Sequence, residues 1–230
     1  MLTFGFAALL GALYGLVFWG LQKAKLLPET RHRYIRNVTI GSILWLVYMS
    51  ALAGTGFFRV FTMPPRIGLF LILPLFAGIA YFFLRKKHAV LAQAIPPAWP
   101  LYLQSFRIAV ELLILGMFWR GMFPVEPTME GYNFDILAGL TAPVVAYLAF
   151  QRKAISRQIV RWWNILGLVL LANVVIIFNT LLLKPALWGY DSSPVNPAFG
   201  AMPYLQIAGI FMPLAVFLHF FSLAQMRNKA

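Results

Sequence analysis

Residues 101–123 read LYLQSFRIAVELLILGMFWRGMF, an apolar stretch with few polar side chains. At about 1.5 Å per residue, a helix of this length spans a hydrocarbon core of roughly 30 Å. The stretch nevertheless places Arg107 and Glu111 one helical turn apart, well inside the apolar run. Its length predicts a transmembrane helix, and its two charges require partners inside the membrane.

Long apolar runs recur along the rest of the chain. Of the 230 residues, 61% are hydrophobic and 11% are charged, a balance far from that of a water-soluble domain. Unpaired strand edges are unstable in lipid, so we expect the runs to be helices. The predicted fold class is all-α, with one domain over residues 1–230 and seven transmembrane helices. We place these near 4–22, 37–56, 67–84, 101–123, 134–151, 162–183 and 202–224.

The basic residues predict the orientation. Fourteen of the 19 Lys and Arg residues fall after the first, third and fifth apolar runs or in the C-terminal tail. Because cytoplasmic loops collect Lys and Arg, we expect the N-terminus outside and the C-terminus inside. The net charge of +13 is then mainly a topology signal. We expect attraction to anionic lipid headgroups at the inner rim, and no nucleic-acid binding, because the charges are dispersed over short loops.

One face of the 101–123 helix is polar. Gln104, Arg107 and Glu111 share it, because they are spaced at i, i+3 and i+7. Entering from the inner side near Pro100, Glu111 lies about 16 Å deep, where a carboxyl group needs a partner, a proton or water. Either Arg107 and Glu111 form an ion pair that fixes helix packing, or they line a polar cavity. We add Asn173, at mid-depth in the sixth run, to this intramembrane polar site.

The outer loop 124–135, PVEPTMEGYNFD, gathers the acidic residues Glu126, Glu130 and Asp135 with Asn133. Carboxylate oxygens suit Ca²⁺, but their spacing here differs from that of an EF-hand loop. We expect Asn133 to cap the next helix and Asp135 to lie in its first turn, where a carboxylate favours the helix dipole.

Several chemistries have no support in the sequence. The chain has no cysteine, which excludes disulfides and thiolate ligands, and its three histidines include one, His219, near the inner end of a helix. We therefore predict no metal site and no cofactor, and an interfacial role for His219. No nucleophile elbow or other ordered catalytic set is present, so we do not predict an enzyme. Pro143 and Pro213 lie within apolar runs and are expected to bend their helices.

Three segments resemble a group of small uncharacterised bacterial inner-membrane proteins. They are QSFRIAVE at 104–111, MEGYNFDILAGLTAP at 129–143 and LHFFSL at 218–223. The resemblance implies a multi-pass protein of the bacterial inner membrane. It draws attention to the same polar residues in the 104–111 and 129–143 segments, and it implies no activity.

The sequence supports two functional hypotheses. The first is a helical bundle that binds or transports a small solute or lipid through the polar layer of Arg107, Glu111 and Asn173. The second is a structural or assembly subunit of a larger membrane complex, in which the polar residues fix helix packing. The expected partners are membrane lipids, with a small ligand in the first case and a membrane protein or a second copy of the chain in the second.

Overall fold

The computed structural model describes residues 1–85 and 88–227, and these residues form helices and loops without strands. The α-helices are α1 (Leu2–Lys23), α2 (Pro28–Gly54), α3 (Leu73–Leu84), α4 (His88–Ala94), α5 (Trp99–Leu103), α6 (Phe106–Phe118), α7 (Ile136–Ala146), α8 (Arg157–Leu183) and α9 (Met212–Arg227). Short 3₁₀ turns occur at η1 (Phe57–Arg59), η4 (Pro185–Trp188) and η5 (Pro197–Gly200). Three π-helical turns extend longer helices: η2 (Gly68–Ile72), η3 (Tyr147–Gln151) and η6 (Ile207–Phe211).

The all-helical, membrane-type fold is confirmed. Five segments are long and apolar enough to cross a membrane: Leu2–Lys23, Pro28–Gly54, Trp99–Phe118, Arg157–Leu183 and Ile207–Met226. The segments expected near 67–84 and 134–151 form shorter apolar helices, Gly68–Leu84 and Ile136–Gln151.

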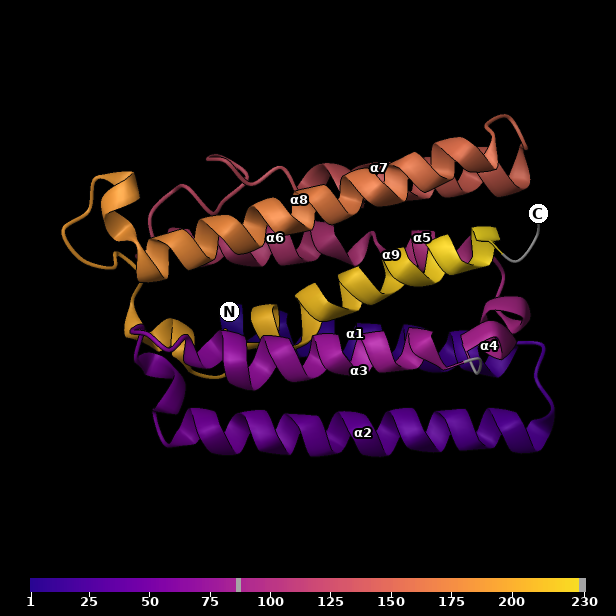
Figure 1. Ribbon diagram of the computed structural model, residues 1–230, viewed down its shortest axis with the longest axis horizontal. Helices are drawn as coiled ribbons and strands as arrows, with labels where there is room; N and C mark the ends of the chain where they lie inside the picture. Colours follow the sequence, from indigo (N-terminus) through magenta and orange to yellow (C-terminus); the bar gives the residue numbers. More distant parts are fainter. Residues whose placement is uncertain (86–87, 228–230) are drawn as a thin grey trace.

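The long helices run roughly along one common axis (Figure 1). In this view α9 lies in the middle, with α7 and α8 on one side, α1 and α3 on the other, and α2 at the edge. The α1–α2 and α7–α8 connections and helix α4 lie at the same end of the bundle as the last turn of α9, which we call the basic end. Most of the basic residues belong to this end, although Lys86, Lys87 and Lys229 lie outside the described residues.

Helix α2 begins nine residues earlier than predicted. Pro28 occupies its first turn, where the fixed φ of proline suits a helix start. Arg31, Arg33 and Arg36 therefore lie on the helix and not in a long loop. The short link from α1 is held against α4 by the Lys25 N–H, which donates to the Ala94 carbonyl at 3.0 Å.

The 101–123 segment is not one continuous helix, as predicted, but two. Between α5 and α6 the backbone tightens to 3₁₀-type bonds, with the Arg107 N–H donating to the Gln104 carbonyl and the Ile108 N–H to the Ser105 carbonyl, both at 3.1 Å. The polar residues Gln104 and Arg107 thus flank a local break in the helix.

Two prolines shape how α2 attaches to the bundle. Pro74 and Pro213 have no N–H to donate to Phe70 and Gly209, four residues earlier. The Tyr48 hydroxyl donates to the Phe70 carbonyl at 3.1 Å, and the Trp45 indole donates to the Gly209 carbonyl at 2.8 Å. Side chains of α2 therefore use carbonyls of η2 and η6, the π turns before α3 and α9, that the prolines leave without their usual helical donor.

Candidate functional site: two cavities and a buried polar network

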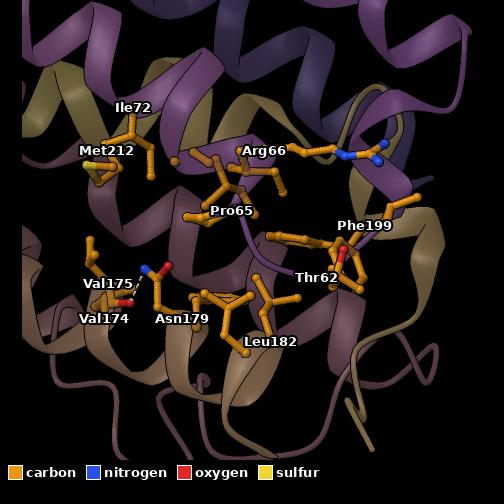
Figure 2. Close-up of a pocket in the computed structure, with 18 residues that line it drawn as sticks. Thr62, Pro65, Arg66, Ile72, Val174, Val175, Asn179, Leu182, Phe199 and Met212 are labelled. Carbon is orange, nitrogen blue, oxygen red and sulfur yellow. Dashed lines mark hydrogen bonds between the residues drawn. The ribbon is translucent and has the colours of Figure 1, made fainter.

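A small apolar crevice lies at the end opposite the basic end (Figure 2). Its walls come from the 60–68 segment, from α8 and from the start of the last span, and its volume is ≈ 70 Å³. Few polar groups line it, and one of them, the Asn179 amide, donates to the Val175 carbonyl of its own helix at 2.7 Å. The crevice has room for little more than a small apolar group.

A larger cavity, of ≈ 620 Å³, lies between α1, α2, α3, α5 and α9. We call it the basic-end cavity, because Tyr34 and Asn37 near the start of α2, and Leu91 of α4, line it. Its walls are mainly apolar, and Trp45, Pro74 and Leu214 mark its deeper end. Tyr34 and Asn37 line its other end, close to the start of α2. The cavity is therefore apolar at mid-depth and more polar towards the basic end.

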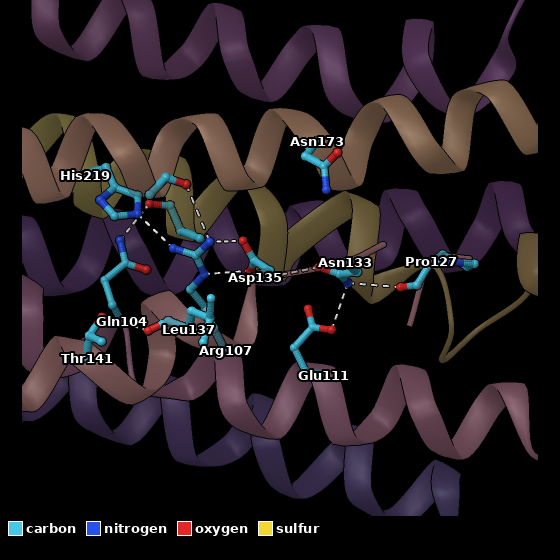
Figure 3. A network of polar contacts seen from close by, with 12 residues as sticks. Gln104, Arg107, Glu111, Pro127, Asn133, Asp135, Leu137, Thr141, Asn173 and His219 are labelled. Carbon is cyan, nitrogen blue, oxygen red and sulfur yellow. Dashed lines mark hydrogen bonds and ion pairs between the residues drawn. The ribbon is translucent and has the colours of Figure 1, made fainter. Parts of the chain in front are cut away.

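Five of the eight predicted polar residues come together inside the bundle with residues that were not predicted (Figure 3). Four parts of the chain contribute to this buried polar network: α5–α6, the segment before α7, α8 and α9. Its members are Gln104, Arg107, Glu111, Asn133, Asp135, Asn164, His219 and Ser222, all buried.

Arg107 is the centre of the network. Its Nε donates to Asp135 Oδ2 at 2.6 Å and its Nη2 pairs with Oδ1, so the guanidinium and the carboxylate are joined by two parallel bonds. The predicted alternative of an ion pair between Arg107 and Glu111 is wrong. Side chains in a helix tilt towards its N-terminus, so Arg107 extends away from the residue one turn later and towards a carboxylate on another element.

His219 is the second partner of Arg107. The Arg107 Nη1 donates to His219 Nε2 at 2.8 Å, and because arginine has no acceptor, Nε2 must be unprotonated. His219 Nδ1 then carries the hydrogen and donates to Asn164 Oδ1 at 2.9 Å. The ring is thus neutral and fully buried, and the predicted interfacial role for His219 is wrong.

Asn164 extends the network to the last helix. Its Nδ2 donates to Ser222 Oγ at 3.0 Å and to the Val160 carbonyl at 2.8 Å. Each polar atom of this amide side chain therefore has a partner. The close approach of α8 to α9 depends on Gly167, because a Cβ at this position would overlap the His219 ring. The Gly167 carbonyl also lies 3.5 Å from Arg107 Nη2.

Glu111 and Asp135 are linked through Asn133. The Asn133 amide nitrogen donates to Glu111 Oε2 at 2.7 Å and to the Pro127 carbonyl at 2.9 Å, and its oxygen accepts from the Asp135 N–H at 2.9 Å. Asn133 is therefore not the predicted helix cap. It forms an Asx turn with Asp135, which is the N-cap residue of α7 and not part of its first turn as predicted, and it holds the 124–135 loop against Glu111.

Asn173 and Gln104 take different places. Asn173 is half-buried and donates to the Tyr132 carbonyl at 2.7 Å, so it supports the loop next to Asn133 and does not join the Arg107 layer as predicted. Gln104 Nε2 donates to the Ala215 carbonyl at 3.0 Å, whereas its Oε1 is buried without a hydrogen-bond partner. Gln104 therefore ties α5 to α9 beside the network.

The outer acidic loop is less acidic at its surface than predicted, because Asp135 is buried with Arg107. Glu126 accepts a hydrogen bond from the Tyr190 hydroxyl at 2.9 Å, and burial together with this carboxylate raises the pKa of Tyr190. Glu130 is exposed. Within the described residues, no group of three or more His, Asp or Glu side chains is placed to hold a metal ion.

Sequence reasoning missed Asn164, Gly167 and Ser222. A usable signal existed for two of them, because Asn164 and Ser222 are polar residues inside long apolar runs. Gly167 has no such signal, since its importance depends on which side chain faces it.

Comparisons of the chain with protein-family models, curated proteins and solved structures find no match.

Proposed function

We propose that this protein binds one lipid or lipid-like amphiphile in the basic-end cavity, as a seven-span protein of the bacterial inner membrane with its N-terminus outside. The observation that carries this proposal is the cavity itself. Its ≈ 620 Å³ falls in the range of about 300–1,000 Å³ that ligand pockets occupy. Mainly apolar walls suit a hydrocarbon chain.

The distribution of polar groups supports an amphiphile and not a purely apolar ligand. The polar side chains Tyr34 and Asn37 line the end of the cavity near the basic end. Trp45 lies about 16 Å from Tyr34 along the axis of α2. The exposed residues Arg33 and Arg36 adjoin Tyr34 and Asn37 in the helix. A bound amphiphile would place its tail between the helices and an anionic head near these arginines.

The structure of α2 supports entry from the bilayer. Trp45 and Tyr48 fasten the helix to η6 and η2, the turns before α9 and α3, at the deeper end of the cavity. Towards the basic end, α2 faces the cavity and carries exposed apolar residues such as Val38. A ligand that approaches within the membrane would enter between α2 and its neighbours.

The polar network supports a different role from the one the sequence favoured. Arg107 binds both Asp135 and His219, so these side chains join α6, α7 and α9 in one arrangement. Such contacts are what a packing role requires. Passage of a solute through the polar layer would need these bonds to break.

The test is native mass spectrometry of the protein gently extracted from its own membrane. We expect one bound amphiphile in the wild-type protein and its loss in Gly78→Phe. Gly78 lines the cavity, and a Cβ there meets nothing within 4 Å, so the new ring projects into free space.

The matched control is Gly11→Phe, because Gly11 is exposed on α1 and a Cβ there also meets nothing within 4 Å. This variant should keep the amphiphile. Equal retention in Gly78→Phe and Gly11→Phe would contradict the proposed site. A stoichiometric protein partner with no bound amphiphile would instead favour the subunit hypothesis.

A further inference from the structure

Glu111 differs from the other charged members of the network in having no cation of its own. Its side chain is buried in α6, with 1% of its surface exposed. In the described part of the chain, its hydrogen-bond partner is the Asn133 amide at 2.7 Å. An amide donates one hydrogen bond to a carboxyl oxygen and brings no charge.

The charges around Glu111 do not balance if it is ionised. Arg107 is joined to Asp135 by two bonds, and its remaining terminal nitrogen donates to His219. His219 is neutral, because its two ring nitrogens are one acceptor and one donor. One cation therefore faces two carboxyl groups.

The helices packed around α6 supply no further charge. Helix α8 has no charged residue between Arg161 and Lys184, and α9 has none from Met212 to Met226. In α1 the first charged side chain is Lys23, at the far end, and the terminal Met1 is fully exposed. An ionised Glu111 would thus leave an uncompensated negative charge inside the membrane, which is strongly unfavourable.

The hydrogen bonds decide which carboxyl group takes the proton. Asp135 accepts two guanidinium bonds and therefore favours its ionised form. Glu111 accepts a single bond from a neutral amide, so it is the group that binds a proton at lower cost.

A metal ion fits the position less well than a proton. Cations such as Na⁺ or Ca²⁺ need several oxygen ligands. The nearest candidate oxygens are already used, because Asn133 Oδ1 accepts from the Asp135 N–H and the Pro127 carbonyl accepts from Asn133. A proton needs one carboxyl oxygen and no such set.

We infer that Glu111 is a proton-binding site, which holds a proton at neutral pH and exchanges it with the outer side of the membrane. The route of exchange follows from Asn133 and Pro127, since both belong to the outer loop that covers Glu111. This inference is independent of amphiphile binding, because none of the residues that line the basic-end cavity belongs to the buried polar network.

The first experiment is infrared spectroscopy of the protein in lipid bilayers. The difference between wild type and Glu111→Gln should show the carbonyl stretch of one protonated carboxylic acid at neutral pH, shifted in D₂O and lost at alkaline pH. Glutamine has the shape of protonated glutamate and accepts the same bond from Asn133, so the variant should fold. The control Glu130→Gln removes an exposed group. The difference between wild type and this control should show a carboxylate band and no band of a protonated acid.

A second experiment uses the wild-type protein alone. Dicyclohexylcarbodiimide adds to protonated carboxyl groups: the acidic hydrogen goes to nitrogen, the carboxyl oxygen bonds to the central carbon, and no group leaves. Migration of the acyl group to nitrogen then gives a stable N-acylurea. We expect the α6 peptide to carry one such adduct at neutral pH and to lose it as the pH is raised.

Two results would overturn the inference. One is a carboxylate band for Glu111 in the infrared difference spectrum at neutral pH. The other is an α6 peptide that stays unmodified by the carbodiimide at every pH tested. Neither result affects the amphiphile proposal, whose test measures a bound ligand and uses a variant in α3.

Discussion

Arg107 illustrates how this protein keeps a cation inside an apolar bundle. Asp135 supplies the opposite charge, and the neutral His219 accepts a further hydrogen bond from the guanidinium. Removal of one member of a buried pair leaves the other charge without compensation, which costs about 3–5 kcal/mol. We expect Asp135→Asn to destabilise the protein by this amount, measured by unfolding in mixed micelles titrated with a denaturing detergent.

A double variant separates this charge effect from lost packing. Arg107→Met combined with Asp135→Leu removes both charges, so it should be clearly more stable than Asp135→Asn alone. Part of the loss should remain, because His219 Nε2 no longer has a donor. The single variants Arg107→Met and Asp135→Leu complete the comparison. If the double variant lost more unfolding free energy than these two single variants lose together, the pair would not be the stabilising unit.

Gly167 gives a second prediction for a single residue. A Cβ there would overlap the His219 ring, so Gly167→Ala should force α8 away from α9 and cost about 1–3 kcal/mol. At Gly11 a Cβ meets nothing within 4 Å, and Gly11→Ala should leave the stability unchanged or slightly raised. The same detergent titration compares the two, and equal stability in both variants would contradict the tight contact.

At the scale of elements, the attachment of α2 to the bundle depends on two hydrogen bonds to backbone carbonyls, each four residues before a proline. Trp45→Phe removes the donor to the Gly209 carbonyl and should cost about 1 kcal/mol, typical of hydrogen bonds between membrane helices. In Pro213→Ala the new N–H offers Gly209 a donor within its own helix. Trp45→Phe should therefore cost less in that background, and a double-mutant cycle measures the difference. Additive costs would show that the two groups do not share this carbonyl.

The elements and their contacts were predictable to different degrees. Long apolar runs are enough to predict the helices, because length and hydropathy alone decide what crosses a bilayer. The polar face of Gln104, Arg107 and Glu111 was predictable from helical spacing. The partner of Arg107 was not, since Asp135 lies 28 residues away and the choice between two carboxyl groups depends on side-chain direction and on how α7 docks.

For the whole molecule, the distribution of charge predicts the orientation. Most of the basic residues lie at the basic end, where the last turn of α9 also lies (Figure 1). Basic residues are retained on the cytoplasmic side, so this end should face the cytoplasm. The chain has no cysteine, and each single-cysteine variant therefore reports one position without background labelling.

Labelling with a membrane-impermeant maleimide tests both the orientation and one of the shorter helices, Gly68–Leu84. Ser192→Cys and Met63→Cys, at exposed positions opposite the basic end, should react in intact spheroplasts. Ala154→Cys and Gln93→Cys, exposed at the basic end, should react only after permeabilisation. Met63 and Gln93 flank Gly68–Leu84, so opposite results for this pair mean that the shorter helix crosses the membrane. Labelling of both Met63→Cys and Gln93→Cys in intact spheroplasts would mean that Gly68–Leu84 does not cross the membrane. The reverse pattern at all four positions would mean that the protein has the opposite orientation.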